Sequence, residues 1–236
     1  MNTIYFHIGL PKTGTTYIQN ILKQDSRINL SRSNIHKFHK DDGFNFLAGK
    51  VNVDSNETYL LRGEGAKKYN MMLSLCKIRE SFQNIKIIVT LRSPYSALLS
   101  MFKYRIKNGN HFKNFDDWFF NDEAQDFFSV LHFATLHKSL NTFFKNSEIS
   151  YVFYEDLKSG KMVEEFYNTL NLKKHEINLK EKVNESLSNT ELLKINFCNK
   201  YISNKKIRNF FVKFLPHFIL KIKIIFLKAN LRIKYY

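Results

Sequence analysis

The chain has 236 residues, of which 44% are hydrophobic and 15% aromatic, so disorder is excluded as its overall state. This length fits one α/β domain with a full hydrophobic core. The formal net charge is +16, and the sequence has no uninterrupted apolar run of about 18 residues, the length that a membrane-spanning helix needs.

Strand-like and helix-like patterns alternate along the chain. Apolar, β-branched runs predict strands near residues 3–8, 58–62, 86–91 and 150–154. Helical patterns fall near residues 15–24, 70–83, 95–107, 124–145, 161–170 and 188–203. Strands separated by helices imply crossover connections and a parallel sheet, which binds its ligands at the carboxyl ends of the strands. We therefore expect an α/β domain with a central parallel sheet over residues 1–203.

The segment 9–16, Gly-Leu-Pro-Lys-Thr-Gly-Thr-Thr, joins the first predicted strand to the first predicted helix. A Gly-containing turn at a helix start presents several backbone N–H groups at one point, which is the geometry that holds a phosphate or sulfate. In the nucleotide-triphosphatase loop a Lys follows the second Gly, but here Thr15 has that position and Lys12 precedes Gly14. The loop therefore departs from the ATP and GTP pattern.

This Pro-Lys-Thr-Gly-Thr-Thr loop resembles the 5′-phosphosulfate-binding loop of the sulfotransferases that use 3′-phosphoadenosine 5′-phosphosulfate (PAPS). The resemblance implies a three-layer fold like that of the P-loop-containing nucleoside triphosphate hydrolases. It also implies that Lys12 meets the bridging oxygen of the donor, while Thr13, Gly14, Thr15 and Thr16 hold its 5′-phosphosulfate. Taken alone, the loop also fits an ordinary strand-to-helix turn.

A second motif follows the strand predicted at 86–91. Arg92 closes that strand, Pro94 starts a helix, and Ser100 lies eight residues after Arg92, about two helical turns along. An Arg can grip a phosphate bidentately while a helix hydroxyl adds one more bond. This R-x-P-x-x-x-x-x-S arrangement resembles the 3′-phosphate-binding motif of the same family, which implies that Arg92 and Ser100 bind the cofactor.

A third match is the Tyr-Glu-Asp-Leu turn at residues 154–157, which resembles a turn found late in many sulfotransferases. The acidic pair is mostly architectural in that family. We therefore expect Glu155 and Asp156 to be structural, with Asp156 as a cap or hydrogen-bond anchor. With these motifs the resemblance spans residues 2–203.

Sulfuryl transfer requires a base for the proton of the acceptor. Glu64 follows the strand predicted at 58–62, and carbohydrate and tyrosyl-protein sulfotransferases commonly use a Glu after this strand. The Lys and Pro of their E-K-x-P-x-Y-like pattern are missing here. His111 and His7 are the fallback bases, although His7 lies inside the first strand. The chain shows no His or Cys spacing typical of a metal site, so we expect no metal.

Residues 204–236 form a basic amphipathic segment, either distinct from the sulfotransferase domain or part of it. From Lys200 onward the chain has ten Lys or Arg residues and no Asp or Glu, so this end supplies ten of the sixteen excess positive charges. Residues 205–236 fit two interpretations, a segment that lies on an anionic membrane surface or a last helix packed on the domain. No nucleic-acid-reading module accompanies the charge, which argues against a nucleic-acid partner.

These features predict a sulfotransferase that moves a sulfuryl group from PAPS to a hydroxyl or amine of a glycan or glycolipid, with adenosine 3′,5′-bisphosphate (PAP) as product. The N-terminal residues lack a secretory leader, so we expect the protein in the cytoplasm, with the basic segment as a peripheral contact to the inner membrane surface. Two rivals remain. One is a nucleotide-dependent kinase or hydrolase with a degenerate phosphate loop, and the other is a non-catalytic basic protein that binds membranes or nucleic acid.

Overall fold

The computed structural model describes residues 3–32, 45–57, 71–174 and 188–204. These residues fall into two compact units. The first unit consists of the described residues within 1–98 and 122–184. The second consists of the described residues within 99–121 and 185–236. The domain boundary predicted between residues 203 and 204 stays a prediction.

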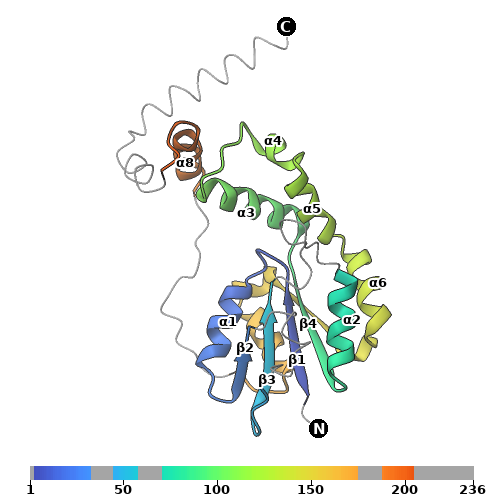
Figure 1. The fold of residues 1–236 in the computed structure, drawn as a ribbon. Helices are drawn as coiled ribbons and strands as arrows, with labels where there is room; N and C mark the ends of the chain where they lie inside the picture. The colour runs from blue at the N-terminus through green and yellow to red at the C-terminus, as the bar shows by residue number, and fades with distance from the viewer. Residues whose placement is uncertain (1–2, 33–44, 58–70, 175–187, 205–236) are drawn as a thin grey trace. The chain divides into compact units, whose positions relative to one another are not determined.

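The first unit is built around a parallel sheet with the strand order β2-β3-β1-β4-β5 (Figure 1). The central strand β1 pairs in register with both neighbours, so that Ile4 lies opposite Asn52 on one side and Ile85 on the other. The strands are β1 Ile4–Gly9, β2 Ile28–Ser31, β3 Val51–Asn56, β4 Ile85–Leu91 and β5 Ile149–Phe153.

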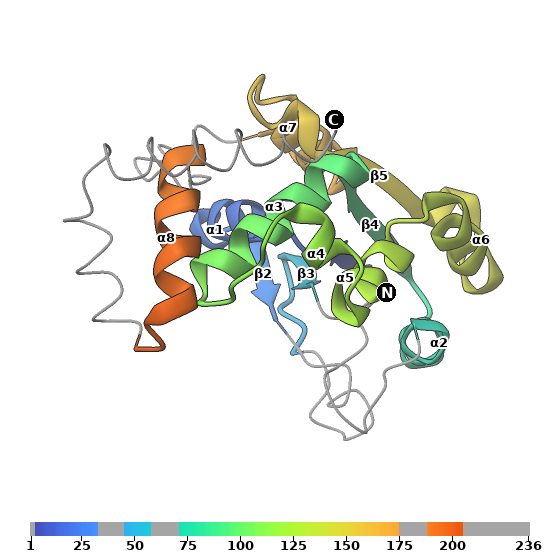
Figure 2. The same ribbon diagram turned by 90° about the horizontal axis from the view of Figure 1, so that it is seen from above.

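Helices cover both faces of this sheet (Figures 1 and 2). Helices α1 (Thr15–Gln24) and α7 (Lys161–Thr169) pack on one face, where their apolar side chains meet Tyr5 of β1. Helices α2 (Met71–Ser81) and α6 (Phe133–Phe143) lie side by side on the other. Because both faces are covered, β1 is buried along its whole length. The predicted three-layer α/β fold with a central parallel sheet is confirmed.

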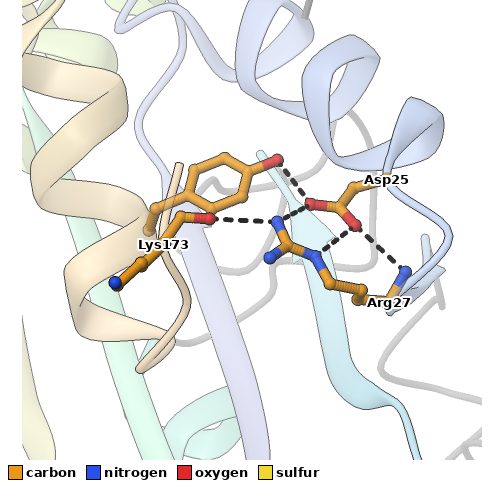
Figure 3. A network of polar contacts seen from close by, with 4 residues as sticks. Asp25, Arg27 and Lys173 are labelled. Atoms are coloured by element: carbon orange, nitrogen blue, oxygen red, sulfur yellow. Dashed lines mark hydrogen bonds and ion pairs between the residues drawn. The ribbon is translucent and has the colours of Figure 1, made fainter. Parts of the chain in front are cut away.

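An ion-paired network joins α1 to α7 on their shared face (Figure 3). Asp25, directly after α1, accepts hydrogen bonds from Nε of Arg27 at 2.9 Å, from Nη2 of Arg27 at 2.6 Å and from the hydroxyl of Tyr167 at 3.0 Å. Arg27 Nη2 also donates to the carbonyl of Lys173. The hydrogen bonds from Arg27 lower the pKa of Asp25 to about 2, so the carboxylate is ionised at neutral pH.

The second unit has a small aromatic core. Phe102 of α3 (Pro94–Lys107) packs against Phe115 and Trp118 of α4 (Phe115–Phe119), with ring centroids 5.4–5.7 Å apart. The N-cap of α4 is Asn114, whose side chain accepts from the N–H of Asp117 at 2.8 Å.

Helix α8 (Asn189–Tyr201) holds the segment that follows α3 in the second unit. Its Asn196 donates to the carbonyl of Phe112 at 2.6 Å and accepts from the N–H of the same residue at 3.1 Å. Its Asn199 donates to the carbonyl of Ile106 at 2.7 Å. Two asparagines of one helix therefore fix the backbone over residues 106–112.

Some of the predicted elements differ from the observed ones. The strand predicted at 58–62 lies outside the described residues, and β2 and β3 were not predicted from the sequence. The single helix predicted over 124–145 was wrong, since α5 (Asp122–Val130) and α6 are separate helices. The break falls at Leu131, which is buried, and at His132, which caps α6.

Two short 3₁₀ turns flank β5, at Asn146–Glu148 and Tyr154–Leu157.

No helix among the described ranges has both the length and the apolar character needed to cross a bilayer.

Candidate functional site

The loop between β1 and α1 has a conformation that its glycines make possible. Lys12 and Gly14 both adopt left-handed backbone conformations, with φ of 69° and 83°. A Cβ on Gly14 would lie 3.1 Å from the ring of Tyr154. A Cβ on Gly9 would lie 2.0 Å from Oγ1 of Thr15. The loop therefore lies tight against its surroundings at both of its glycines.

The start of α1 offers donors for an anion. The N–H of Ile18 makes a helical hydrogen bond to the carbonyl of Gly14 at 3.1 Å, so the N–H groups of Thr15, Thr16 and Tyr17 precede the helical bonding pattern. Oγ1 of Thr15 is buried and finds no hydrogen-bond partner among the described residues. Buried hydroxyls normally have a partner. These groups fit a phosphate or sulfate at the helix N-terminus.

Arg92 braces this loop from the end of β4. Its Nη1 donates to the carbonyl of Lys12 at 2.7 Å, and its Nε donates to the hydroxyl of Ser96 at 2.5 Å. The guanidinium lies over the ring of Tyr154, 4.1 Å from the centroid. Burial lowers the pKa of Arg92, but a guanidinium keeps its charge in proteins. A positive charge therefore lies beside the loop at the carboxyl edge of the sheet.

Of the acidic pair after β5, Glu155 has the structural role predicted for this turn. Oε1 of Glu155 accepts a hydrogen bond from the N–H of Ser93 at 2.8 Å, just before α3 begins. Asp156 contributes its backbone carbonyl, which accepts from the hydroxyl of Ser159 at 2.9 Å. The side chain that anchors the start of α3 is therefore Glu155, whereas the sequence had favoured Asp156.

A carboxylate that the sequence did not single out lies near the loop. Glu57 directly follows β3, and since Asn56 pairs with Ile8 of β1, Glu57 comes level with Gly9. Burial raises the pKa of Glu57, while the positive charges of Lys12 and Arg32 act in the opposite direction.

The second predicted strand, at 58–62, lies outside the described residues, so it does not coincide with β3. Because β3 ends at Asn56, the carboxylate directly after this strand is Glu57, while Glu64 lies outside the described residues. Val51 and Val53 alternate with polar residues, and this period-2 pattern was the available signal for β3.

Other predicted residues have different surroundings. The Thr13 hydroxyl and N–H both donate to the carbonyl of Leu10, so this residue faces the protein. His7 is completely buried, and burial lowers its pKa to about 3. His111 belongs to the second unit, where its Nδ1 donates to the carbonyl of Asn196 at 2.9 Å. Ser100 lies on α3 within the second unit, and its part in a cofactor site stays a prediction.

Comparisons with known proteins concern the family and the fold. A family model described as "Sulfotransferase domain" matches residues 5–215. The crystal structure of a sulfotransferase from Alicyclobacillus acidocaldarius is 13% identical, with a TM-score of 0.57 over 75% of this chain and 85% of that one. The sulfotransferase domain from the curacin biosynthetic pathway is 16% identical, with a TM-score of 0.51 over 87% and 80%. At these identities the likeness is one of fold. A search of curated protein sequences finds no match.

Proposed function

This chain belongs to the sulfotransferase domain family, and from that premise we propose that it transfers a sulfuryl group from PAPS to a hydroxyl or amine of a glycan or glycolipid. The observation that carries the choice of donor is the β1–α1 loop. It combines a buried hydroxyl without a partner among the described residues, on Thr15, with the open start of a helix and two neighbouring cations, Lys12 and Arg92. PAP is the other product.

The loop residues would hold the 5′-phosphosulfate of the donor. The N–H groups of Thr15 and Thr16 and the hydroxyl of Thr15 are hydrogen-bond donors of the kind that bind an oxyanion at a helix start. Arg92 has five N–H donors and uses two of them on Ser96 and on the carbonyl of Lys12, so the others can meet the 3′-phosphate. Ser100 adds a hydroxyl to that phosphate in this proposal.

Lys12 serves the reaction itself. As the acceptor oxygen bonds to sulfur, the bond between sulfur and the bridging oxygen breaks, and negative charge builds on the phosphate that leaves. An ammonium beside that oxygen stabilises the charge in the transition state more than in the ground state. The scheme needs no metal ion, because the sulfuryl group carries less negative charge than a phosphoryl group.

Glu57 is the base in this proposal, in place of Glu64. It stands at the carboxyl end of the strand next to β1, close enough to Lys12 to interact with its charge. A carboxylate with a raised pKa accepts a proton more readily, which suits the removal of the acceptor proton. Glu64 stays a rival for this role.

The acceptor class and the location rest on the sequence. Glu64, followed by Tyr69, resembles the base and its context in carbohydrate sulfotransferases, which favours a sugar hydroxyl as the acceptor. The basic residues 205–236 lie outside the described residues, and we propose that they hold the enzyme to an anionic membrane surface in the cytoplasm, near lipid-linked acceptors.

The proposal is tested by transfer of radiolabelled sulfate from PAPS to a panel of glycans and glycolipids. Lys12→Ala should lower kcat/KM by at least about 100-fold, the scale for losing one stabiliser of transition-state charge. Lys23→Ala is the matched control, because Lys23 is an exposed lysine in the last turn of α1. Normal turnover of Lys12→Ala would refute the role of this loop.

A further inference from the structure

A chain of buried side chains runs from α1 through the sheet beneath the loop. Nε2 of Gln19 donates to Oγ of Ser55 at 3.0 Å, and the same Oγ lies 2.8 Å from Nδ1 of His7. On the other side of the ring, Nε2 of His7 lies 3.3 Å from Oγ1 of Thr90. All four side chains are at most 6% exposed. The ring of His7 therefore bridges β3 and β4 inside the protein.

The same chain continues into the loop. Oγ1 of Thr90 lies 2.8 Å from Oγ1 of Thr13, which donates to the carbonyl of Leu10 at 2.5 Å. Thr13 is the residue between Lys12 and Gly14, the two left-handed residues of the loop. A contact that fixes Thr13 therefore fixes the loop at the point where its backbone conformation is least common.

The groups at the two ends of this hydrogen-bond chain determine which atom donates in each of its hydrogen bonds. The Leu10 carbonyl can only accept, so the hydroxyl hydrogen of Thr13 points to it, and Thr13 must accept from Thr90. Thr90 has then used its hydrogen and accepts from Nε2–H of His7. In a neutral ring, Nδ1 then carries no hydrogen and accepts from Ser55.

Gln19, at the other end of the hydrogen-bond chain, agrees with this order of donors and acceptors. Nε2 of Gln19 also donates to the backbone carbonyl of Ser55 at 3.0 Å, which identifies it as the amide nitrogen, and a nitrogen of this kind can only donate. Each hydroxyl in the chain then donates once and accepts at least once.

The other neutral tautomer leaves a contact unsatisfied. With the hydrogen on Nδ1, the ring nitrogen Nε2 would need the hydrogen of Thr90, and the 2.8 Å contact between Thr90 and Thr13 would hold no hydrogen. A charged ring is opposed by complete burial. The ring of His7 also packs against the ring of Phe166 in a T-shaped arrangement, with centroids 4.9 Å apart.

We propose that His7, neutral and with its hydrogen on Nε2, is a positioning residue for the phosphosulfate loop, and that it acts through Thr90 and Thr13. This inference rests on the proposed function, which supplies the ligand of the loop. The ring does not touch the donor in this account. It keeps the loop in the shape that gathers the N–H groups of Thr15 and Thr16 at one point.

The first test removes the Thr90 hydroxyl, which links His7 to Thr13, and leaves the ring of His7 in place. In the full-length protein, Thr90→Val keeps the shape of a buried, β-branched strand residue but loses its hydroxyl, whereas Thr90→Ser keeps the hydroxyl. We expect Thr90→Val to raise the Kd for PAP and the KM for PAPS about tenfold, the scale for one buried hydrogen bond. We expect kcat to change less and Thr90→Ser to restore most of the affinity.

The matched control is Thr169→Val, which removes a hydroxyl that donates to the carbonyl of Glu165 in α7. It should leave the affinity for PAP unchanged. If Thr90→Val bound PAP as the wild type does, the positioning role would be overturned and the proposed function would stand. If the wild type failed to bind PAP, the proposed function would fail and the positioning role with it.

The second test needs no ligand. In ¹⁵N NMR spectra of the histidine rings, His7 should show the neutral tautomer with its hydrogen on Nε2 throughout pH 5–8, and its signal is identified by its shift in Thr90→Val. A hydrogen on Nδ1, or a charged ring at pH 6, would contradict the direction of the hydrogen-bond chain and overturn the inference.

Discussion

Replacing Gly9 by Ala tests whether the start of α1 binds the donor. The new Cβ would lie 2.0 Å from Oγ1, 2.9 Å from Cγ2 and 3.0 Å from Cβ of Thr15, so rotating the Thr15 side chain cannot relieve the overlap. The first turn of α1 must therefore move. Overpacking of this kind costs about 1–3 kcal/mol of stability. The displaced Thr15 hydroxyl would also lose its hydrogen bond to the charged ligand. That loss is worth about 1.5–3 kcal/mol of binding free energy, which raises the Kd for PAP roughly 10- to 100-fold.

Calorimetric titration with PAP, next to a urea denaturation curve, separates the two effects. Gly49→Ala is the matched control, because Gly49 has a left-handed φ of 75° but a Cβ added there would meet nothing within 4 Å. This variant should lose about 1 kcal/mol of stability through backbone strain and keep its affinity for PAP. Unchanged affinity in a folded Gly9→Ala protein would refute the assignment of the loop.

Three further substitutions test other parts of the account. Glu57→Gln should lower kcat at least about 100-fold and remove the acidic limb of the pH–rate profile, which burial of Glu57 shifts to higher pH by raising its pKa. The same loss in Glu64→Gln, with Glu57→Gln still active, would assign the base to Glu64 instead. Arg92→Lys keeps the charge but loses the planar fork, so the Kd for PAP should rise about tenfold in calorimetry. Asp25→Asn should lower the free energy of unfolding by about 2 kcal/mol at pH 7, since the pKa of Asp25 is lowered from 3.8 to about 2. That difference should be complete above pH 4 and disappear as the pH falls through about 2; a pH-independent difference in urea denaturation would contradict it.

Local signals in the sequence were enough to predict the β1–loop–α1 unit. The apolar run 4–8, the glycines at 9 and 14 and the helix pattern after them lie within one short stretch, and each indicates its element by itself. Strand β3 is harder to predict, because only Val51 and Val53 mark it among polar residues. The sequence pattern indicated a strand at 58–62 instead, and Glu64 was the carboxylate that followed it.

Long-range contacts explain the rest of what was missed. His7 bonds to Ser55 and Thr90, which lie 48 and 83 residues away along the chain, so no local pattern could indicate that network. The break between α5 and α6 has no Gly or Pro, and it falls at Leu131, which is buried in the fold. Tertiary packing therefore decided both features.

The central claim is that the β1–α1 loop and Arg92 bind the two charged ends of one adenosine derivative. Calorimetric titration of the full-length protein with PAP in the absence of divalent metal, compared with ATP in the presence of Mg²⁺, tests it most directly. PAP should bind without metal and more tightly than ATP with Mg²⁺, and Arg92→Ala should weaken PAP binding. Tighter binding of ATP with Mg²⁺, with no detectable binding of PAP, would contradict it.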